Sequence, residues 1–146
     1  MADRFNLQRF VEAQRALYGT VTAQLQAGRK RSHWMWFIFP QIAGLGRSEM
    51  ARRFAISGLA EARAYLGHAL MGERLRECSR LVAAIEGRSI AEIFGAPDDL
   101  KFHSSMTLFA EAAPDEPLFG ACLQKYFQGR RDAATLSRLQ AGAADR

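Results

Sequence analysis

The sequence predicts an all-α fold in a single domain over residues 1–146. Apolar residues recur every three or four positions through most of the chain, as on the buried face of an amphipathic helix. No segment shows the two-residue alternation between hairpin turns that is typical of strands. With 146 residues, 49% hydrophobic and 24% charged, the chain suits one globular domain. We expect about seven or eight helices, a core over residues 5–140 and loose ends.

The helices expected in the first part of the chain follow its apolar stripes. A long helix is expected over 5–26, because the stripe continues to Gly28, which stops it. A short amphipathic helix is expected over 48–56. A longer pair then follows over 59–67 and 70–87.

The helices of the last third have clear start signals. Ser89 and Glu92 form a capping box for a short helix. Pro97 is followed by Asp98 and Asp99, and all three residues suit the first turn of a helix. Either aspartate also fits a general base beside a pocket. Further helices are expected over 100–112, 117–129 and 133–140, the last capped by Asp132.

The segment 28–46, GRKRSHWMWFIFPQIAGLG, contains both tryptophans. Its central run WMWFIF has no polar side chain and is expected to be covered on all sides, with Lys30, His33 and Gln41 marking its ends. One interpretation is a core element that enters and leaves the interior. The other is a pocket wall, in which Trp34 or Trp36 stacks on a flat ring. Lys30 would then meet an anionic group, and His33 would exchange a proton.

The segment 98–109, DDLKFHSSMTLF, places three hydroxyls in an otherwise apolar helix. Buried hydroxyls need hydrogen-bond partners. Small hydroxyl residues at a helix crossing are one explanation. The other is a site for a phosphate or a ribose, formed by Lys101, Ser104, Ser105 and Thr107.

Several kinds of site lack their sequence signals. The three histidines are isolated, so no metal site is expected, and no phosphate-binding glycine loop or nucleophile elbow is present. We therefore expect no cofactor. The net charge is +5, but the basic residues are scattered, which gives nucleic-acid binding only weak support. Without a signal peptide, a long apolar run or a disulfide framework, the chain is expected to be cytoplasmic and to have no membrane partner.

The motifs HWMWFIFPQ and KFHSSMTLF, with EARAYLGHALMGERLRECSRLV and FQGRRDAATLSRL, closely resemble a bacterial family of unknown function. Its members are all-helical and often catalogued, misleadingly, as calpastatin-like. The resemblance covers residues 7–139, and Phe102 departs from it, because the family pattern has leucine there. It implies no calpain inhibition, since that activity belongs to unrelated disordered chains and this composition is globular.

The resemblance also bears on function. The family's signature positions fall on polar residues set among aromatic ones, which favours a pocket over packing alone. The family's helical layout is distantly similar to domains of NAD and ADP-ribose metabolism that act on N-glycosidic bonds, an analogy of fold only. The signature residues here are Lys30, His33, Trp34, Trp36, Gln41, Lys101, Ser104, Ser105 and Thr107.

Two functions are consistent with these observations. The first is a domain that binds a nucleotide-like or ADP-ribose-like anionic small molecule. If that domain is an enzyme, it is expected to hydrolyse an N-glycosidic bond or a phosphate ester, with His33, Asp99 or Glu12 as acid or base. The second is a non-catalytic helical module that binds a protein or a nucleic acid through the scattered arginines. The sequence does not indicate an oligomeric state.

Overall fold

The computed structural model describes residues 3–144 and forms ten α-helices over that range. No strand occurs among these residues, which contain one isolated parallel bridge between Ile42 and Ile56. The predicted all-α, single-domain fold is confirmed. The helices are α1 (Gln8–Gln14), α2 (Tyr18–Gln26), α3 (Met35–Ile38), α4 (Glu49–Arg53), α5 (Leu59–Gly67), α6 (Met71–Ala83), α7 (Ile90–Phe94), α8 (Asp98–Ala112), α9 (Pro117–Phe127) and α10 (Ala133–Ala144).

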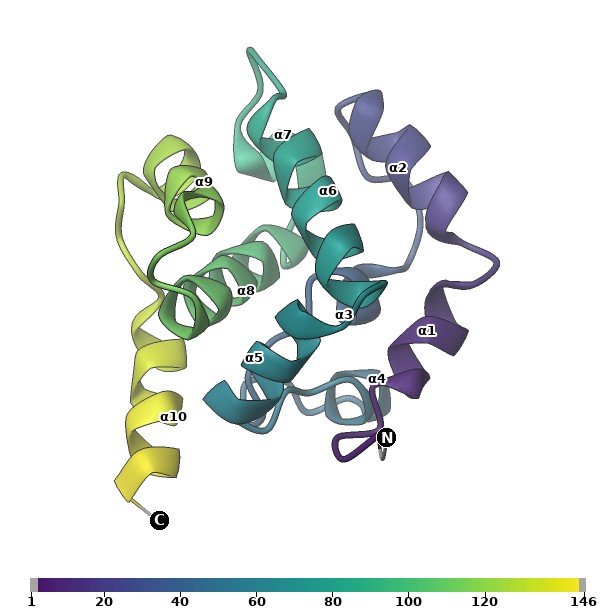
Figure 1. Cartoon of the computed structure of the whole chain (residues 1–146). Coiled ribbons are helices and arrows are strands. Elements are labelled where there is room, and N and C mark those ends of the chain that lie inside the picture. The colour runs from purple at the N-terminus through teal and green to yellow at the C-terminus, as the bar shows by residue number, and fades with distance from the viewer. Residues whose placement is uncertain (1–2, 145–146) are drawn as a thin grey trace.

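The helix count is higher than expected for two reasons. The run 34–39 contains the short helix α3, and the helix expected over 5–26 is divided into α1 and α2. The expectation of one continuous helix is therefore wrong. The division lets α1 pack on α3 while α2 packs on α6, so the two helices lie along different directions (Figure 1). At the end of α1, the buried Gln14 donates from Nε2 to the carbonyl oxygen of Phe37 at 2.6 Å.

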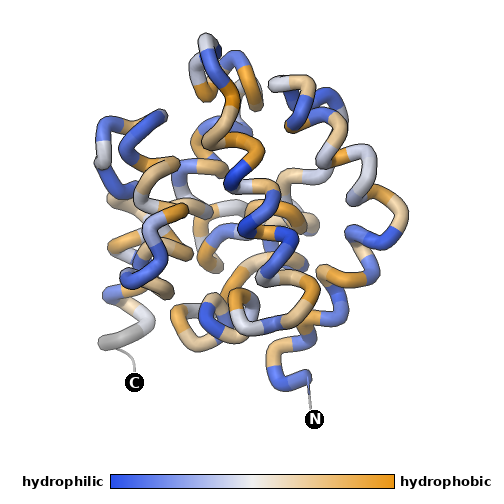
Figure 2. The backbone as a smooth tube through the Cα atoms, turned by 45° about the horizontal axis from the view of Figure 1, so that its top comes forward, coloured by the Kyte–Doolittle hydropathy of each residue, from blue (hydrophilic) through white to orange (hydrophobic). Residues whose placement is uncertain are grey.

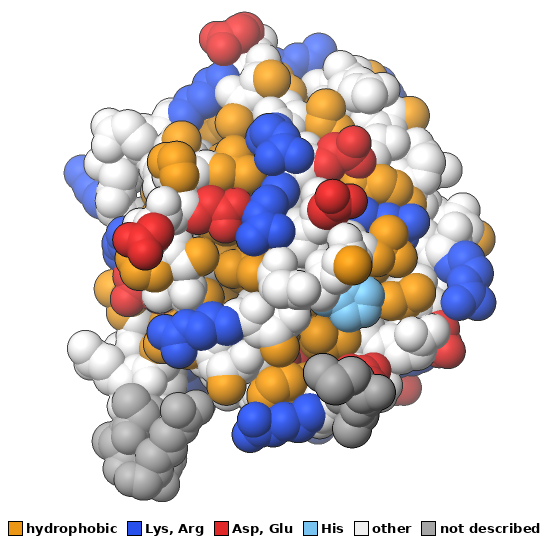
Figure 3. All heavy atoms as spheres, in the orientation of Figure 1, with side chains coloured by type: hydrophobic (Ala, Val, Ile, Leu, Met, Phe, Trp, Pro, Cys, Tyr) orange, Lys and Arg blue, Asp and Glu red, His pale blue; other side chains and the backbone are white. Residues whose placement is uncertain are grey.

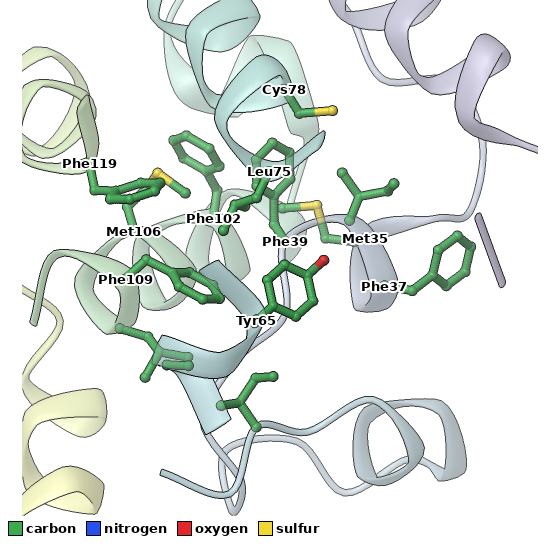
Figure 4. Packing of buried hydrophobic residues seen from close by; sticks show 14 of the residues in the cluster. Met35, Phe37, Phe39, Tyr65, Leu75, Cys78, Phe102, Met106, Phe109 and Phe119 are labelled. Carbon is green, nitrogen blue, oxygen red and sulfur yellow. The ribbon is translucent and has the colours of Figure 1, made fainter. Parts of the chain in front are cut away.

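Helix α8 is the centre of the fold. It packs against α5, α7, α9 and α10 (Figure 1). Its residues from Phe102 to Ala110 are buried with the exception of His103. Phe102 meets Phe39 edge-to-face at 5.0 Å between ring centroids, and Phe109 lies 5.9 Å from Phe119 of α9 (Figure 4). In the outer helices, hydrophobic and hydrophilic residues are instead mixed along the chain, as is typical of amphipathic helices (Figure 2).

The run WMWFIF is mostly core. Trp34 and Phe39 are almost fully buried, and Trp34 donates from its indole nitrogen to Gln24 Oε1 at 2.9 Å. Trp36 is the one residue of the run that stays half-buried. The chain turns after Pro40, and the backbone N–H of Ile56 donates to the carbonyl oxygen of Gln41 at 2.8 Å. The run therefore anchors the interior, while the flanking residues His33 and Gln41 are exposed and half-buried, respectively.

Several predicted helix boundaries are confirmed. The Ser89 and Glu92 capping box is present, and Ser48 caps α4 by accepting a hydrogen bond from the backbone N–H of Ala51. Helix α8 begins at Asp98, directly after Pro97 and a cis Ala96–Pro97 peptide bond. No helix among residues 3–144 is long and apolar enough to cross a membrane. The expectation of loose ends concerns in part residues 1–2 and 145–146, which lie outside the described residues.

Helices α5 and α6 approach each other closely at Gly72. A Cβ atom on Gly72 would lie 2.1 Å from the carbonyl oxygen of Leu66, which is a backbone atom that cannot turn aside. Gly72→Ala is therefore expected to lower the free energy of unfolding by roughly 1–3 kcal/mol, as measured by urea denaturation. The matched control is Gly120→Ala in α9, where nothing lies within 4 Å of the added methyl group. There alanine is expected to stabilise the helix by about 0.5–1 kcal/mol, and equal losses for both variants would contradict this account.

Both cysteines are free and buried. Burial raises the pKa of the Cys78 thiol to about 12, and it raises the pKa of the Cys122 thiol to about 12 as well. At pH 8 the native thiols are expected to react with a disulfide reagent far more slowly than the thiols of the unfolded chain.

Since the pKa of each thiol is higher in the folded state than in the unfolded state, the free energy of unfolding is also expected to fall between about pH 9 and pH 12. Rapid reaction of the folded protein would refute the first expectation, and a free energy of unfolding that urea denaturation finds unchanged between about pH 9 and pH 12 would refute the second.

Candidate functional site

Two lysines from distant parts of the chain meet at one carboxylate. The Nζ atom of Lys30 lies 2.7 Å from Asp98 Oδ2, and the Nζ atom of Lys101 lies 3.5 Å from Asp98 Oδ1. Asp98 and Lys101 stand one turn apart at the start of α8. Lys30 reaches them because its backbone N–H donates to the carbonyl oxygen of Ile93 at 2.8 Å, which holds the segment after α2 against α7. We call Lys30, Asp98 and Lys101 the lysine–aspartate cluster.

Each lysine of the cluster also lies over an indole ring. Lys30 Nζ is 5.3 Å from the ring centroid of Trp34, and Lys101 Nζ is 5.1 Å from that of Trp36. Both distances are within the range of a cation–π interaction. Trp34 is enclosed in the core, so Trp36 is the indole of this site that keeps an exposed part.

The two lysines differ in their access to solvent. The Lys30 side chain is 8% exposed and makes the shorter contact with Asp98, whereas the Lys101 side chain is 24% exposed. Lys30 therefore neutralises most of the Asp98 charge from the buried side. The cluster as a whole carries a formal charge of +1, and Lys101 is the cation that faces outward.

A pocket of about 270 Å³ lies beside Lys101, between the loop after α3, the first turns of α8 and the start of α10. One part of its wall is apolar, and the rest carries an amide, a hydroxyl, an ammonium group and a carboxylate. We call it the α8 pocket, and its lining residues are Gln41, Leu45, Gly46, Pro97, Leu100, Lys101, Ser104, Asp132 and Ala134.

Two hydroxyls of α8 hold the start of α10. The Oγ atom of Ser104 lies 3.1 Å from Asp132 Oδ2 and 3.1 Å from the carbonyl oxygen of Leu100. Thr107 Oγ1 donates to the carbonyl oxygen of His103 and accepts from the backbone N–H of Asp132, each at 2.9 Å. Both side chains are buried and make the contacts expected of hydroxyls at a helix crossing. Ser104 also lines the α8 pocket, so its ligand-binding role stays a prediction.

The other predicted site residues neither belong to the cluster nor line the pocket. Ser105 is fully buried, and its hydroxyl has no hydrogen-bond partner among the described residues. Asp99 accepts at Oδ1 from the backbone N–H of Leu100 and makes no ion pair within residues 3–144. His33 and Glu12 are exposed, and neither lines the α8 pocket. The acid–base roles of Asp99, His33 and Glu12 remain sequence predictions.

The sequence predicted Lys30, Lys101, Trp36, Gln41 and Ser104 as site residues, and the structure brings these five into one region. Asp98 was expected in the first turn of a helix, with a general base as the alternative role. Asp132 was expected as a helix cap. The spacing of three residues between Asp98 and Lys101 is a sequence signal for their ion pair. No sequence pattern indicates that Lys30 joins them, because that contact depends on how α7 packs. No three histidine, cysteine or acidic side chains gather in a metal-binding group within residues 3–144.

The fold and the site define a compact helical domain with a lysine–aspartate cluster and a small pocket at one end of its central helix. The chain belongs to a family of proteins of unknown function, DUF1810, whose family model matches residues 4–139. It is similar to the crystal structure of the conserved hypothetical protein Rv1873 from Mycobacterium tuberculosis, with a TM-score of 0.93 and 56% sequence identity. That similarity covers 94% of this chain and 99% of the other. No curated protein matches the sequence.

The unequal burial of the two lysines leads to a prediction about stability. Lys30→Met leaves the partly buried Asp98 without its closer partner and is expected to lower the free energy of unfolding by about 2 kcal/mol. Lys101→Met is expected to cost less than about 1 kcal/mol, because the longer and more exposed ion pair contributes little. Urea denaturation at low salt measures both values. Equal losses would mean that the two lysines share Asp98 equally.

Proposed function

We propose that this protein binds a small anionic molecule of nucleotide-like chemistry in the α8 pocket, with the anionic group on Lys101. The convergence of Lys30 and Lys101 on Asp98, at the edge of this pocket, is the observation that supports the proposal most strongly. Lysines from two separate segments are brought to one point, and one carboxylate balances only half of their charge.

The charge balance within the lysine–aspartate cluster favours an anion at Lys101, while the pocket lining as a whole, with Lys101 and Asp132, is formally neutral. The Asp98 carboxylate is matched by the nearly buried Lys30, which leaves the charge of Lys101 free to attract a phosphate or a carboxylate. Lys101 is only 24% exposed, so water and salt screen this attraction less than they do at an open surface. An incoming anion can therefore take the place of the longer contact with Asp98.

The shape of the site favours a small ligand with a flat or cyclic part. At about 270 Å³ the α8 pocket is slightly smaller than the roughly 300–1,000 Å³ of common ligand sites. It suits one ring or sugar, and the rest of the ligand would extend over the rim. Leu100 stands on that rim with 63% of its surface exposed, and Trp36 offers an indole beside Lys101.

The proposal concerns binding. Hydrolysis requires an acid or a base at the bound ligand, and the side chains of His33, Glu12 and Asp99 make no hydrogen bond or ion pair with the lysine–aspartate cluster among the described residues. The alternative function, an interaction module for a protein or a nucleic acid, draws on the arginines. On the face shown in Figure 3, basic and acidic side chains are interspersed and form no stripe of one sign. This distribution favours the small-molecule proposal over nucleic-acid binding at that face.

A thermal-shift screen against nucleotides, sugar phosphates, NAD and ADP-ribose tests the proposal. A ligand at 100 times its dissociation constant adds about 2.7 kcal/mol, so the Tm is expected to rise by roughly 5–10 °C. Lys101→Met, which keeps the alkyl chain, is expected to abolish the shift. Arg15→Ala removes one positive charge from an exposed side chain with no hydrogen bond or ion pair to residues 3–144, and it should leave the shift unchanged. Equal shifts in both variants would contradict the proposal.

A further inference from the structure

The α8 pocket carries a second charged group, Asp132, whose two carboxylate oxygens have different surroundings. Oδ2 accepts three hydrogen bonds: from Thr135 Oγ1 at 2.6 Å, from the backbone N–H of Thr135 at 3.0 Å and from Ser104 Oγ at 3.1 Å. Oδ1 accepts none from residues 3–144. The backbone N–H of Asp132 is itself held by Thr107 Oγ1. One oxygen is thus fixed in the protein, and the other is left as an acceptor with a set position.

The position of Asp132 in the pocket is set by α8. Lys101 and Ser104 lie three residues apart on one face of the helix, which is about 4.5 Å along its axis. Ser104 contacts Asp132, while the ammonium group of Lys101 contacts Asp98. No ion pair joins Lys101 and Asp132 among the described residues, although both line the pocket. The pocket lining therefore holds a cation and a hydrogen-bond acceptor that are not paired with each other.

We infer that Asp132 is a specificity-determining residue, and that its Oδ1 atom accepts a hydrogen bond from a hydroxyl of the ligand. The ligand class is then an anion that carries a sugar-type diol at the end opposite its anionic group. This inference rests on the proposed function. Gln41, which also lines the pocket, supplies an amide for the second hydroxyl.

A neutral hydroxyl fits this end of the pocket better than a charged amine does. Three donors already share the charge of Asp132 at Oδ2, which weakens its attraction for a cation. The lysine–aspartate cluster carries a formal charge of +1 one helical turn away and repels a second positive group. A hydroxyl donates to Oδ1 without meeting that repulsion.

Asp132→Asn tests this role while leaving the helix start in place. The amide oxygen can take the position of Oδ2 and keep its three donors, and asparagine caps helices as well as aspartate. The amide NH₂ then replaces Oδ1, which turns the free acceptor into a donor. Binding of AMP and of its 2′,3′-dideoxy analogue is measured by calorimetry, and urea denaturation checks that the variant is folded.

The expected result is that the wild-type protein binds AMP at least about tenfold more tightly than the dideoxy analogue, because the hydrogen bond to the charged Asp132 is lost together with the weaker one to Gln41. Asp132→Asn is expected to weaken the binding of AMP about tenfold and to leave the binding of the analogue unchanged. The comparison of the two ligands on the wild-type protein holds even if the variant does not fold.

Three results would overturn the inference in distinguishable ways. Equal affinity of the wild-type protein for both ligands would show that Asp132 makes no contact with the diol, and it would not contradict the proposed anion site. If Asp132→Asn weakens the binding of AMP and the binding of the analogue by the same factor, Asp132 acts only as a helix cap. Failure of the wild-type protein to bind either ligand removes the proposed function together with this inference.

Discussion

The enclosure of α8 is the constraint on which the rest of the structure depends. Four helices surround it, and from Phe102 to Ala110 every side chain except His103 is buried. A helix buried on all sides has no solvent-exposed face for polar groups. Each hydroxyl that it carries therefore either hydrogen-bonds within the protein or remains unsatisfied. Ser104 and Thr107 find theirs at Asp132 and at backbone carbonyls, and this pairing fixes where α10 begins. Ser105 remains without one among the described residues.

This enclosure also explains where the candidate site lies. Helix α8 leaves the core at its amino end, and its charged residues Asp98, Asp99 and Lys101 stand in that first turn. Acidic residues are favoured there by the helix dipole, and one of them, Asp98, pairs with both lysines. The aromatic run 34–39 packs beneath this end of the helix and sets an indole under each ammonium group. Core and site are therefore built from the same two segments.

Much of the fold could be predicted from the sequence, because apolar periodicity and capping residues act locally. The boundaries at Ser89, Pro97 and Asp132 follow from the chemistry of the residues that stand there. The split between α1 and α2 could not be predicted in this way, since the apolar stripe continues across it. Separate packing partners, α3 for the first helix and α6 for the second, decide that break.

The sequence by itself determined the class of fold, the buried character of WMWFIF and the identity of most polar residues near the pocket. These properties follow from side-chain chemistry and from spacing within one helix. Only the tertiary structure decided which of those residues act together. It paired Lys30 with Asp98, buried Trp34 in the core while leaving Trp36 half-buried, and brought Asp132 and Lys101 into the lining of one pocket. Such contacts join segments far apart in the chain, and helix packing, which no local pattern records, sets their geometry.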